Sequence, residues 1–254
     1  MPQRLPADFH PAADCLKNKV ILVTGAGDGI GRAAAISFAR HGATVILLGR
    51  TTEKLEAVYD EIVAAGSTEP AIFPMNLQGA TQADYEQLAD ALEKEFGKLD
   101  GLLHNASLLG QRRTLAQTTL DSWQDVLQVN VTAAFLMTQA LLPLMAAAEG
   151  ASLVFTSSSV GRKGRAYWGA YSVSKFATEA MMEIFADEEF ALNKIRVNSI
   201  NPGATNTTMR RTAYPGEDPS SNPDPEALMP LYLYLMSETS SAVNGQQFDA
   251  QPKD

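Results

Sequence analysis

Cysteine is nearly absent from this sequence: Cys15 is the only one in 254 residues. A single thiol excludes an internal disulfide and leaves no cysteine cluster for zinc. Histidine is also scarce, and His10, His41 and His104 lack any spacing typical of metal ligands, so no metal site is expected. The simplest interpretation is a cytoplasmic protein without a structural metal.

The sequence also has few positively charged residues and no long apolar runs. The chain has 20 Lys and Arg against 29 Asp and Glu, and its formal net charge is −9. Such an acidic chain is not expected to bind nucleic acid or an anionic membrane surface. No apolar run approaches the ~20 residues of a membrane span, and the N-terminus lacks the apolar core of an export signal. The length and the 45 % hydrophobic content fit one α/β domain with a large core.

Strand and helix patterns alternate along most of the chain. Short apolar, β-branched runs predict strands, and stretches of helical periodicity bounded by glycine predict helices. The predicted strands cover residues 20–23, 44–48, 71–75, 99–104, 152–157, 195–200 and 246–249. The predicted helices run from Gly31 to a stop at Gly42 and over residues 51–65, 83–96, 120–145, 170–192 and 226–236. This order predicts an α/β fold: a single Rossmann-type doubly wound parallel sheet of about seven strands with helices on both faces.

Two segments fall outside this alternation. Residues 1–18 are expected to form an irregular N-terminal arm, followed by a single dinucleotide-binding catalytic domain at 19–254. Residues 201–225 are rich in Pro, Thr, Ser and Gly and have little regular pattern. Long loops of that kind inside a compact domain are usually lids or binding loops. We therefore expect residues 204–225 to form much of a substrate pocket.

A glycine-rich loop separates the first predicted strand from the first predicted helix. It carries Thr24, Gly25, Gly27, Gly29 and Gly31, in the pattern G-x-x-x-G-x-G. Glycines at this place let the backbone turn tightly and approach a pyrophosphate, and the following helix N-terminus offers free N–H groups and a positive dipole. The loop predicts a dinucleotide site, with a purely structural turn as the alternative.

A second group of residues has the chemistry of an acid–base pair. Tyr171 and Lys175 lie four residues apart on a predicted helix and therefore share one face. The lysine ammonium is expected to lower the tyrosine pKa from its usual value of about 10. Ser158, in the preceding loop, is suited to hold a carbonyl or alcohol oxygen. The alternative for the Tyr–Lys pair is an ordinary contact on a surface helix.

Together with further motifs, these residues resemble the short-chain dehydrogenase/reductase family, in its shorter subfamily. The motifs follow the family's order: the glycine loop, HNAS at 104–107, Asn130 in LQVNVTAAF, SSSVG at 157–161, YSVSK at 171–175 and NPGATNT at 201–207. The resemblance covers residues 19 to about 250. It implies a Rossmann-fold oxidoreductase that transfers a hydride reversibly between a nicotinamide cofactor and a carbonyl or alcohol.

The resemblance also implies a role for each catalytic residue. Tyr171 would be the general acid in reduction and the general base in oxidation. Lys175 would lower the pKa of Tyr171 and bond the nicotinamide ribose, and Asn130 would complete a proton relay through water. Ser158 would polarise the substrate oxygen, with its two serine neighbours as alternatives.

The choice between NADP(H) and NAD(H) depends on the end of the second predicted strand. Gly49 stands where the family's NAD enzymes place an acidic residue, and Arg50 follows, which suits the 2′-phosphate of NADP(H). Asp28 argues the other way, because a carboxylate that pointed inward would repel this phosphate. We therefore predict NADP(H), with NAD(H) as the alternative. The residues that the resemblance assigns to cofactor binding are Thr24, Gly25, Gly27, Asp28, Gly29, Ile30, Gly31, Arg50, Asn76, Leu77, Asn105, Ala106, Ser107, Tyr171, Lys175, Pro202, Gly203, Thr205 and Thr207.

Basic residues cluster in three loops at the predicted carboxyl ends of strands. They are Arg112, Arg113, Arg162, Lys163, Arg165, Arg210 and Arg211. Because arginine recognises carboxylate and phosphate well, these loops suggest an anionic or acyl-carrier-linked substrate. The alternative is that they are solvated loops or ion pairs at a subunit interface. The residues expected to bind substrate are Ser158, Arg112, Arg165, Trp168 and Arg210.

Three functional hypotheses follow from the sequence. The first is an NADP(H)-dependent oxidoreductase that acts on a small carbonyl or alcohol, and the second an NAD-dependent secondary-alcohol dehydrogenase. The third is a non-catalytic NADP(H)-binding regulator, against which the intact catalytic residues argue. By resemblance, the protein is expected to be a homodimer or homotetramer built through the helices predicted at 120–145 and 170–192.

Overall fold

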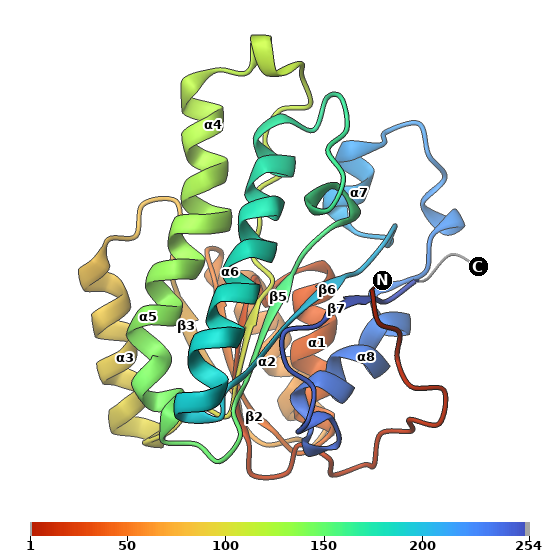
Figure 1. The fold of residues 1–254 in the computed structure, drawn as a ribbon. Coiled ribbons are helices and arrows are strands. Elements are labelled where there is room, and N and C mark those ends of the chain that lie inside the picture. The colour runs from red at the N-terminus through yellow and green to blue at the C-terminus, as the bar shows by residue number, and fades with distance from the viewer. Residues whose placement is uncertain (1, 252–254) are drawn as a thin grey trace.

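A sheet of seven parallel strands runs through the middle of the molecule, in the order β3-β2-β1-β4-β5-β6-β7 (Figure 1). The structure is a computed structural model and describes residues 2–251, except for the side chain of Asn193. The strands are β1 (Val20–Thr24), β2 (Thr44–Gly49), β3 (Ala71–Pro74), β4 (Gly101–His104), β5 (Ser152–Thr156), β6 (Arg196–Asn201) and β7 (Gln247–Asp249). The order reverses between β1 and β4, which is where open α/β sheets form their ligand crevice. The predicted doubly wound sheet is confirmed.

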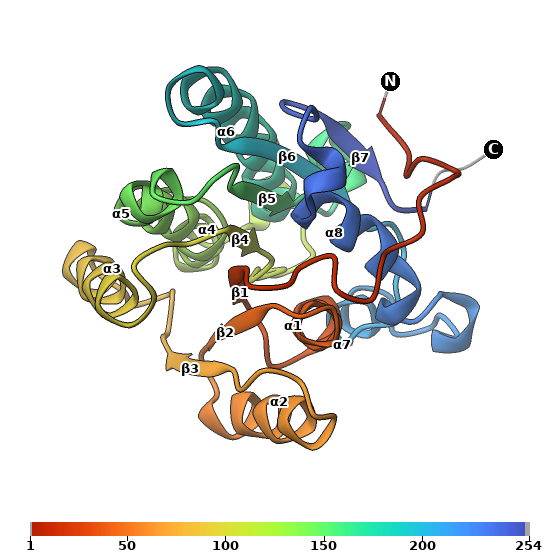
Figure 2. The ribbon, with the colours of Figure 1, turned by 90° about the horizontal axis from the view of Figure 1, so that it is seen from below.

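Helices cover both faces of this sheet (Figure 2). One face carries α1 (Gly29–Arg40), α2 (Thr52–Ala64) and α8 (Met229–Met236). The other carries α3 (Gln82–Phe96), α4 (Leu120–Leu127), α5 (Ala133–Ala146) and α6 (Gly169–Asn193). Because both faces are covered, β1 and β5 are buried along their whole length and read as continuous apolar runs.

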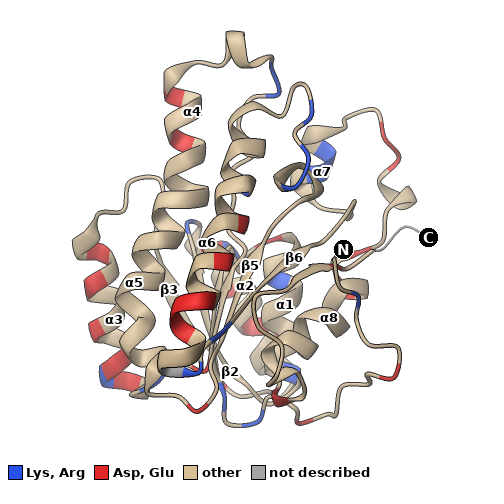
Figure 3. Ribbon diagram, in the orientation of Figure 1, with Lys and Arg blue, Asp and Glu red and all other residues tan. Residues whose placement is uncertain are grey.

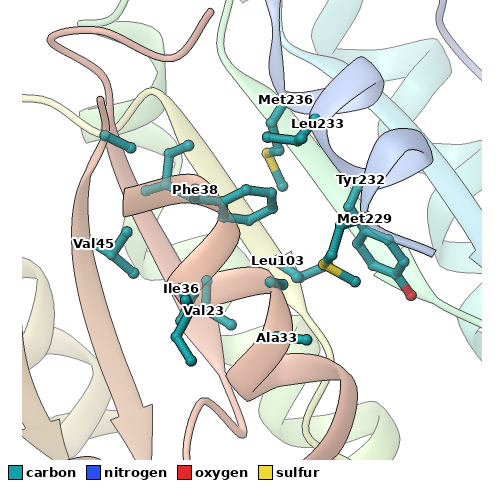
Figure 4. Packing of buried hydrophobic residues seen from close by; sticks show 14 of the residues in the cluster. Val23, Ala33, Ile36, Phe38, Val45, Leu103, Met229, Tyr232, Leu233 and Met236 are labelled. Carbon is teal, nitrogen blue, oxygen red and sulfur yellow. The ribbon is translucent and has the colours of Figure 1, made fainter. Parts of the chain in front are cut away.

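The core on the α1 side is packed with side chains from distant parts of the chain (Figure 4). Phe38 of α1 is fully buried and points toward α8, whose Met236 belongs to the same cluster. Alanines at positions 33–35 are buried on the same helix, and their small side chains let α1 lie close to the sheet. This close packing sets the position of the loop between β1 and α1.

The helix predicted over 120–145 differs from the expectation. A wider π-helical turn at Gln128–Thr132 separates α4 from α5. By length and composition alone, the segment Leu120–Ala146 is apolar enough to cross a membrane, but half of its apolar window is buried inside the domain. This burial is the pattern of a core helix, which packs here against α3 and α6.

The segment after β6 also has more structure than predicted. It contains α7 (Thr208–Ala213), whose first turn is capped by the Thr207 hydroxyl, which accepts a hydrogen bond from the Arg210 N–H. Residues 2–18 follow an irregular path, in which Gln3 pairs with Phe248 at the edge of β7. Phe9 in this arm packs edge-on against Tyr234, with ring centroids 5.1 Å apart.

Candidate active site

The main cavity, of about 500 Å³, opens at the carboxyl ends of the strands. The sheet order divides it into two halves. The loops after β1, β2 and β3 line one half, and the loops after β5 and β6, with α7, line the other. The loop after β4 contributes to the region between them, because β4 lies between β1 and β5.

The glycine loop forms a cradle at the first half of the cavity. Gly25 and Gly29 have φ of +68° and +53°, in the left-handed region that favours glycine. A Cβ at Gly31 would lie 2.3 Å from the Gly25 carbonyl oxygen, so a side chain there would open the turn. Asp28 makes no side-chain capping hydrogen bond at the start of α1, which leaves the helix N-terminus with its donors available. The cradle therefore fits the pyrophosphate of a dinucleotide.

Thr24 acts behind this cradle and does not line the main cavity. Its hydroxyl donates to the Leu103 carbonyl and accepts from the N–H groups of Asn105, at 2.9 Å, and Ala106, at 3.0 Å. These bonds join the end of β1 to the end of β4. Thr24 thus positions two residues that do line the cavity.

Arg50 and Asp28 lie at the part of the cavity where the sequence places the ribose of the adenosine. Arg50 is exposed and lines the cavity, and within residues 2–251 no carboxylate pairs with it. The Asp28 carboxylate instead forms an ion pair with Lys54, at 2.9 Å, and the hydrogen bond from Lys54 lowers its pKa. The charge that would repel a 2′-phosphate is therefore balanced by a lysine. Lys54, which also lines the cavity, was not predicted; it lies four residues after Arg50, in the first turn of α2.

Tyr171, Lys175 and Ser158 meet on one wall of the cavity. Tyr171 lies in the first turn of α6, its hydroxyl bonds to Ser158, and the Lys175 Nζ is 5.6 Å from the centre of its ring. The Lys175 ammonium donates to the Thr156 carbonyl at 2.7 Å. The structure thus brings together the three residues for which the sequence predicted acid–base chemistry.

The pKa values of this group differ from the expectation. Burial raises the pKa of Tyr171 to about 12, and the Ser158 hydrogen bond offsets only part of this. Burial also lowers the pKa of Lys175 to about 8, against the opposing effect of the Glu179 carboxylate. The expected fall in the tyrosine pKa is absent because desolvation of the buried phenol is the dominant effect.

Asn130 is buried at the π-helical turn and lies behind the main cavity. Its side-chain oxygen accepts from the Leu108 N–H at 2.7 Å, and its nitrogen donates to the Leu108 carbonyl and to the Ser174 hydroxyl. Such turns are common at functional sites because they redirect a side chain. Asn130 thus holds the loop after β4 against α6.

Glu179, one turn beyond Lys175, is a buried carboxylate that sequence reasoning missed. It accepts hydrogen bonds from the hydroxyls of Ser157 and Ser199, both at 2.6 Å, and from Arg162 at 2.9 Å. Arg162 also pairs with Asp249 at 2.7 Å. The network joins α6 to β5, β6 and β7 just beneath Ser158. A glutamate four residues after the lysine was the available signal.

The basic loops do gather near α7 and the start of α6 (Figure 3), but some of their charges are engaged by other groups. Arg162 belongs to the buried Glu179 network and offers no free cation to the cavity. Arg210 lines the cavity but makes a bidentate ion pair with Glu217, with both bonds at 2.6 Å. Arg211 donates to the side chains of Asn206 and Thr208.

Two of the residues expected to bind substrate lie outside the main cavity. Arg165 lines a separate surface hollow together with Tyr167, Val173 and Phe176. Arg112 lies over the rings of Trp168 and Tyr214, which are themselves 6.1 Å apart, and donates to the Ala213 carbonyl. Neither guanidinium lines the cavity that holds Tyr171, so their clustering in the sequence did not translate into a cationic pocket.

The structure places most other predicted residues on the cavity. Those that line it are Gly25, Gly27, Asp28, Gly29, Ile30, Arg50, Asn76, Leu77, Asn105, Ala106, Ser107, Ser158, Trp168, Tyr171, Lys175, Pro202, Gly203, Thr205, Thr207 and Arg210. Those that do not are Thr24, Gly31, Arg112, Asn130 and Arg165. Lining residues that were not predicted include Lys54, Gln78, Leu108, Leu109, Met209 and Ala213. The apolar ones carry no local signal, because only the fold brings them to the cavity.

Comparison with known proteins agrees with this geometry. A family model described as short chain dehydrogenase matches residues 19–218. The uncharacterized oxidoreductase YciK of Escherichia coli K12 is 52% identical over 244 residues, covering 96% of both chains.

Solved structures give the same result. A short chain dehydrogenase from Pseudomonas syringae is 55% identical, with a TM-score of 0.95, over 96% of this chain and 99% of that one. A short chain dehydrogenase from Escherichia coli CFT073, complexed with NADPH, is 52% identical, with a TM-score of 0.93, over 95% of this chain and 100% of that one. The chain therefore belongs to the short-chain dehydrogenase/reductase family.

Proposed function

We propose that this protein is an NADP(H)-dependent oxidoreductase that interconverts a carbonyl compound and the corresponding alcohol. The observation that carries the proposal is the meeting of Ser158, Tyr171 and Lys175 on the wall of a cavity that also contains the glycine cradle. The NADPH complex of the Escherichia coli CFT073 relative supports the choice of cofactor. An acidic, single-cysteine chain that uses NADP(H) fits a cytoplasmic location.

The residues present fit NADP(H) along the first half of the cavity. The cradle of Gly25 and Gly29 would hold the pyrophosphate, and Arg50 would bond the 2′-phosphate. Asn76 offers an amide for the adenine. When bound, the cofactor would supply or accept the hydride at the nicotinamide.

The protein's own groups would handle the proton. The Ser158 hydroxyl would donate a hydrogen bond to the substrate oxygen and hold it beside the Tyr171 hydroxyl. In reduction, that hydroxyl would give its proton to the oxygen and become a phenolate. The nearby Lys175 ammonium would stabilise the phenolate by charge. Asn130, which holds Leu108 and Ser174, would keep the neighbouring loop in place.

Replacing Tyr171 by Phe tests this function. Loss of the phenolic proton should lower the rate of NADPH-dependent turnover of carbonyl compounds at least about a thousandfold, because acid–base catalysis usually contributes a factor of this order. NADPH binding, followed by nucleotide fluorescence, should stay within about twofold of the wild type, because the ring is kept.

The competing regulator hypothesis gives a different result. It predicts that the wild type binds NADPH but reduces none of a broad carbonyl panel, so that Tyr171→Phe changes nothing. Full activity of the variant would instead contradict the assignment of Tyr171.

A further inference from the structure

We propose that the substrate half of the cavity takes an uncharged carbonyl compound with an apolar, planar group that packs against Trp168, rather than an anion. This inference rests on the proposed function, because it assigns the substrate class of the same site. It is based on the contacts that the basic residues around α7 make with other groups of the protein.

The walls of this half are apolar and aromatic around the reactive groups. Leu108 and Leu109 come from the loop after β4, and Met209 and Ala213 come from α7. Trp168 lies just before Tyr171, with their ring centroids 5.7 Å apart. A planar apolar group bound here would contact Trp168 while its carbonyl faced the tyrosine.

The one arginine that lines this half is already neutralised. The Arg210 guanidinium makes two hydrogen bonds of 2.6 Å to the Glu217 carboxylate, and it lies 3.8 Å from the centre of the Tyr214 ring. The ion pair is partly buried, and Glu217 already balances the charge of Arg210 in a matched bidentate geometry, so an incoming carboxylate would gain less from this arginine. Binding of a neutral substrate does not depend on that charge.

Arg112 supports Trp168 from outside the cavity. Its guanidinium carbon lies 4.6 Å from the Trp168 ring and 4.8 Å from the Tyr214 ring, and it donates to the Ala213 carbonyl. This stack joins the loop after β4 to α7 and fixes the orientation of the tryptophan. Arg112 is not among the residues that line the cavity, and its buried Nε makes no hydrogen bond within residues 2–251.

A pair of compounds with the same reacting ketone tests the inference. Methyl 4-acetylbenzoate and 4-acetylbenzoate differ in charge at the para position, far from the carbonyl that is reduced. At pH 7 with NADPH, the kcat/KM for the ester should exceed that for the acid at least tenfold. An equal or higher value for the acid would overturn the inference.

Binding gives a second measurement that does not depend on turnover. Both compounds are titrated into the wild type, with and without NADPH, by quenching of tryptophan fluorescence. The ester should bind more tightly than the acid, whereas tighter binding of the acid, or binding of neither at millimolar concentration, would overturn the inference. Failure of the proposed function looks different: the ester still binds, but no ketone is reduced.

Two variants test the structural cause. Glu217→Gln should free Arg210 and raise kcat/KM for the acid by about tenfold, as expected for a charge-assisted bidentate contact, while leaving the ester nearly unchanged. Glu226→Gln, an exposed carboxylate in the same segment, is the matched control and should change neither value. Trp168→Ala should lower kcat/KM for the ester about tenfold with NADPH affinity retained. If neither Glu217→Gln nor Trp168→Ala alters the preference, the inference is wrong.

Discussion

Among single side chains, Arg50 is the one on which we propose that cofactor choice depends. It lines the cavity without a carboxylate partner in residues 2–251, while Lys54 balances the nearby Asp28. A charge-assisted hydrogen bond contributes about 1.5–3 kcal/mol. We therefore expect Arg50→Ala to raise the Kd for NADPH about tenfold to a hundredfold.

NADH provides the control for this prediction, because it lacks the 2′-phosphate. Its Kd in fluorescence titrations should stay the same in Arg50→Ala. Arg40→Ala, an exposed arginine at the end of α1, should change neither affinity. An equal loss of NADH and NADPH affinity would mean that Arg50 has a structural role instead.

Lys175 links catalysis to stability through its burial. Its pKa in the folded protein is about 8, below the ordinary value of 10.5. Below pH 8 the lysine is therefore charged in both the folded and the unfolded protein, and the folded state bears the full free-energy cost of burying that charge. Between pH 8 and 10.5 the unfolded chain holds the proton more strongly, so this group's contribution to stability rises with pH. Lys175→Met should therefore be inactive yet more stable than the wild type at pH 7.

Urea unfolding at two pH values measures this effect. The stability advantage of Lys175→Met should be largest at pH 7 and shrink by pH 10, as the wild-type lysine loses its proton. A variant that is less stable than the wild type at pH 7 would show that the hydrogen bond to the Thr156 carbonyl outweighs the cost of burial.

Among the helices, α6 carries Tyr171 and Lys175, the pair proposed to act in catalysis, and is anchored by Glu179. Removing the carboxylate leaves the Arg162 guanidinium partly buried with one partner fewer, and two serine hydroxyls without their acceptor. Glu179→Ala should lower the free energy of unfolding by about 3–5 kcal/mol, as is typical when one partner of a buried pair is lost. Glu179→Gln keeps an acceptor and should cost less.

Thermal and urea denaturation of the two variants provide the measurement. If they are equally unstable, the charge itself matters more than the hydrogen bonds. If neither is destabilised, the network does not hold α6 in place. The activity of Glu179→Gln, measured at a temperature where the variant is folded, then shows whether the network also positions Ser158, the residue directly after Ser157.

For the molecule as a whole, α5 and α6 lie side by side (Figure 1), and both expose apolar side chains. Phe135, Phe176 and Ile184 are 43%, 45% and 55% exposed. Exposed apolar patches of this kind often mark protein interfaces, and we propose that they join two copies of the chain. Phe176→Glu combined with Ile184→Glu should then give a monomer in light scattering coupled to size exclusion.

The matched control for this prediction is Val63→Glu, which changes an exposed apolar residue on α2. It should leave the oligomeric state of the wild type intact. A monomeric wild type would contradict the proposed interface directly.

Local patterns in the sequence were enough to predict the elements and the reactive groups. Strand and helix periodicities depend on neighbours a few residues apart, and so do the glycine loop and the spacing of Tyr171 and Lys175. The π-helical turn was missed, and so was the hydrogen bond of its Asn130 to Leu108, 22 residues away, because local periodicity encodes neither. The desolvation of Tyr171 was also missed, since it comes from surroundings that only the fold assembles.

The sequence by itself determined the family and the sheet, and it singled out the Tyr–Lys pair that we propose as the acid–base residues, because each has a local signature. Only the tertiary structure decided which charges are free. Asp28 pairs with Lys54, which is 26 residues away in the sequence, and Arg162 pairs with Asp249, which is 87 residues away. Since an ion pair cancels the field of each partner, a cluster of arginines in the sequence says little about the charge of a pocket until those partners are known.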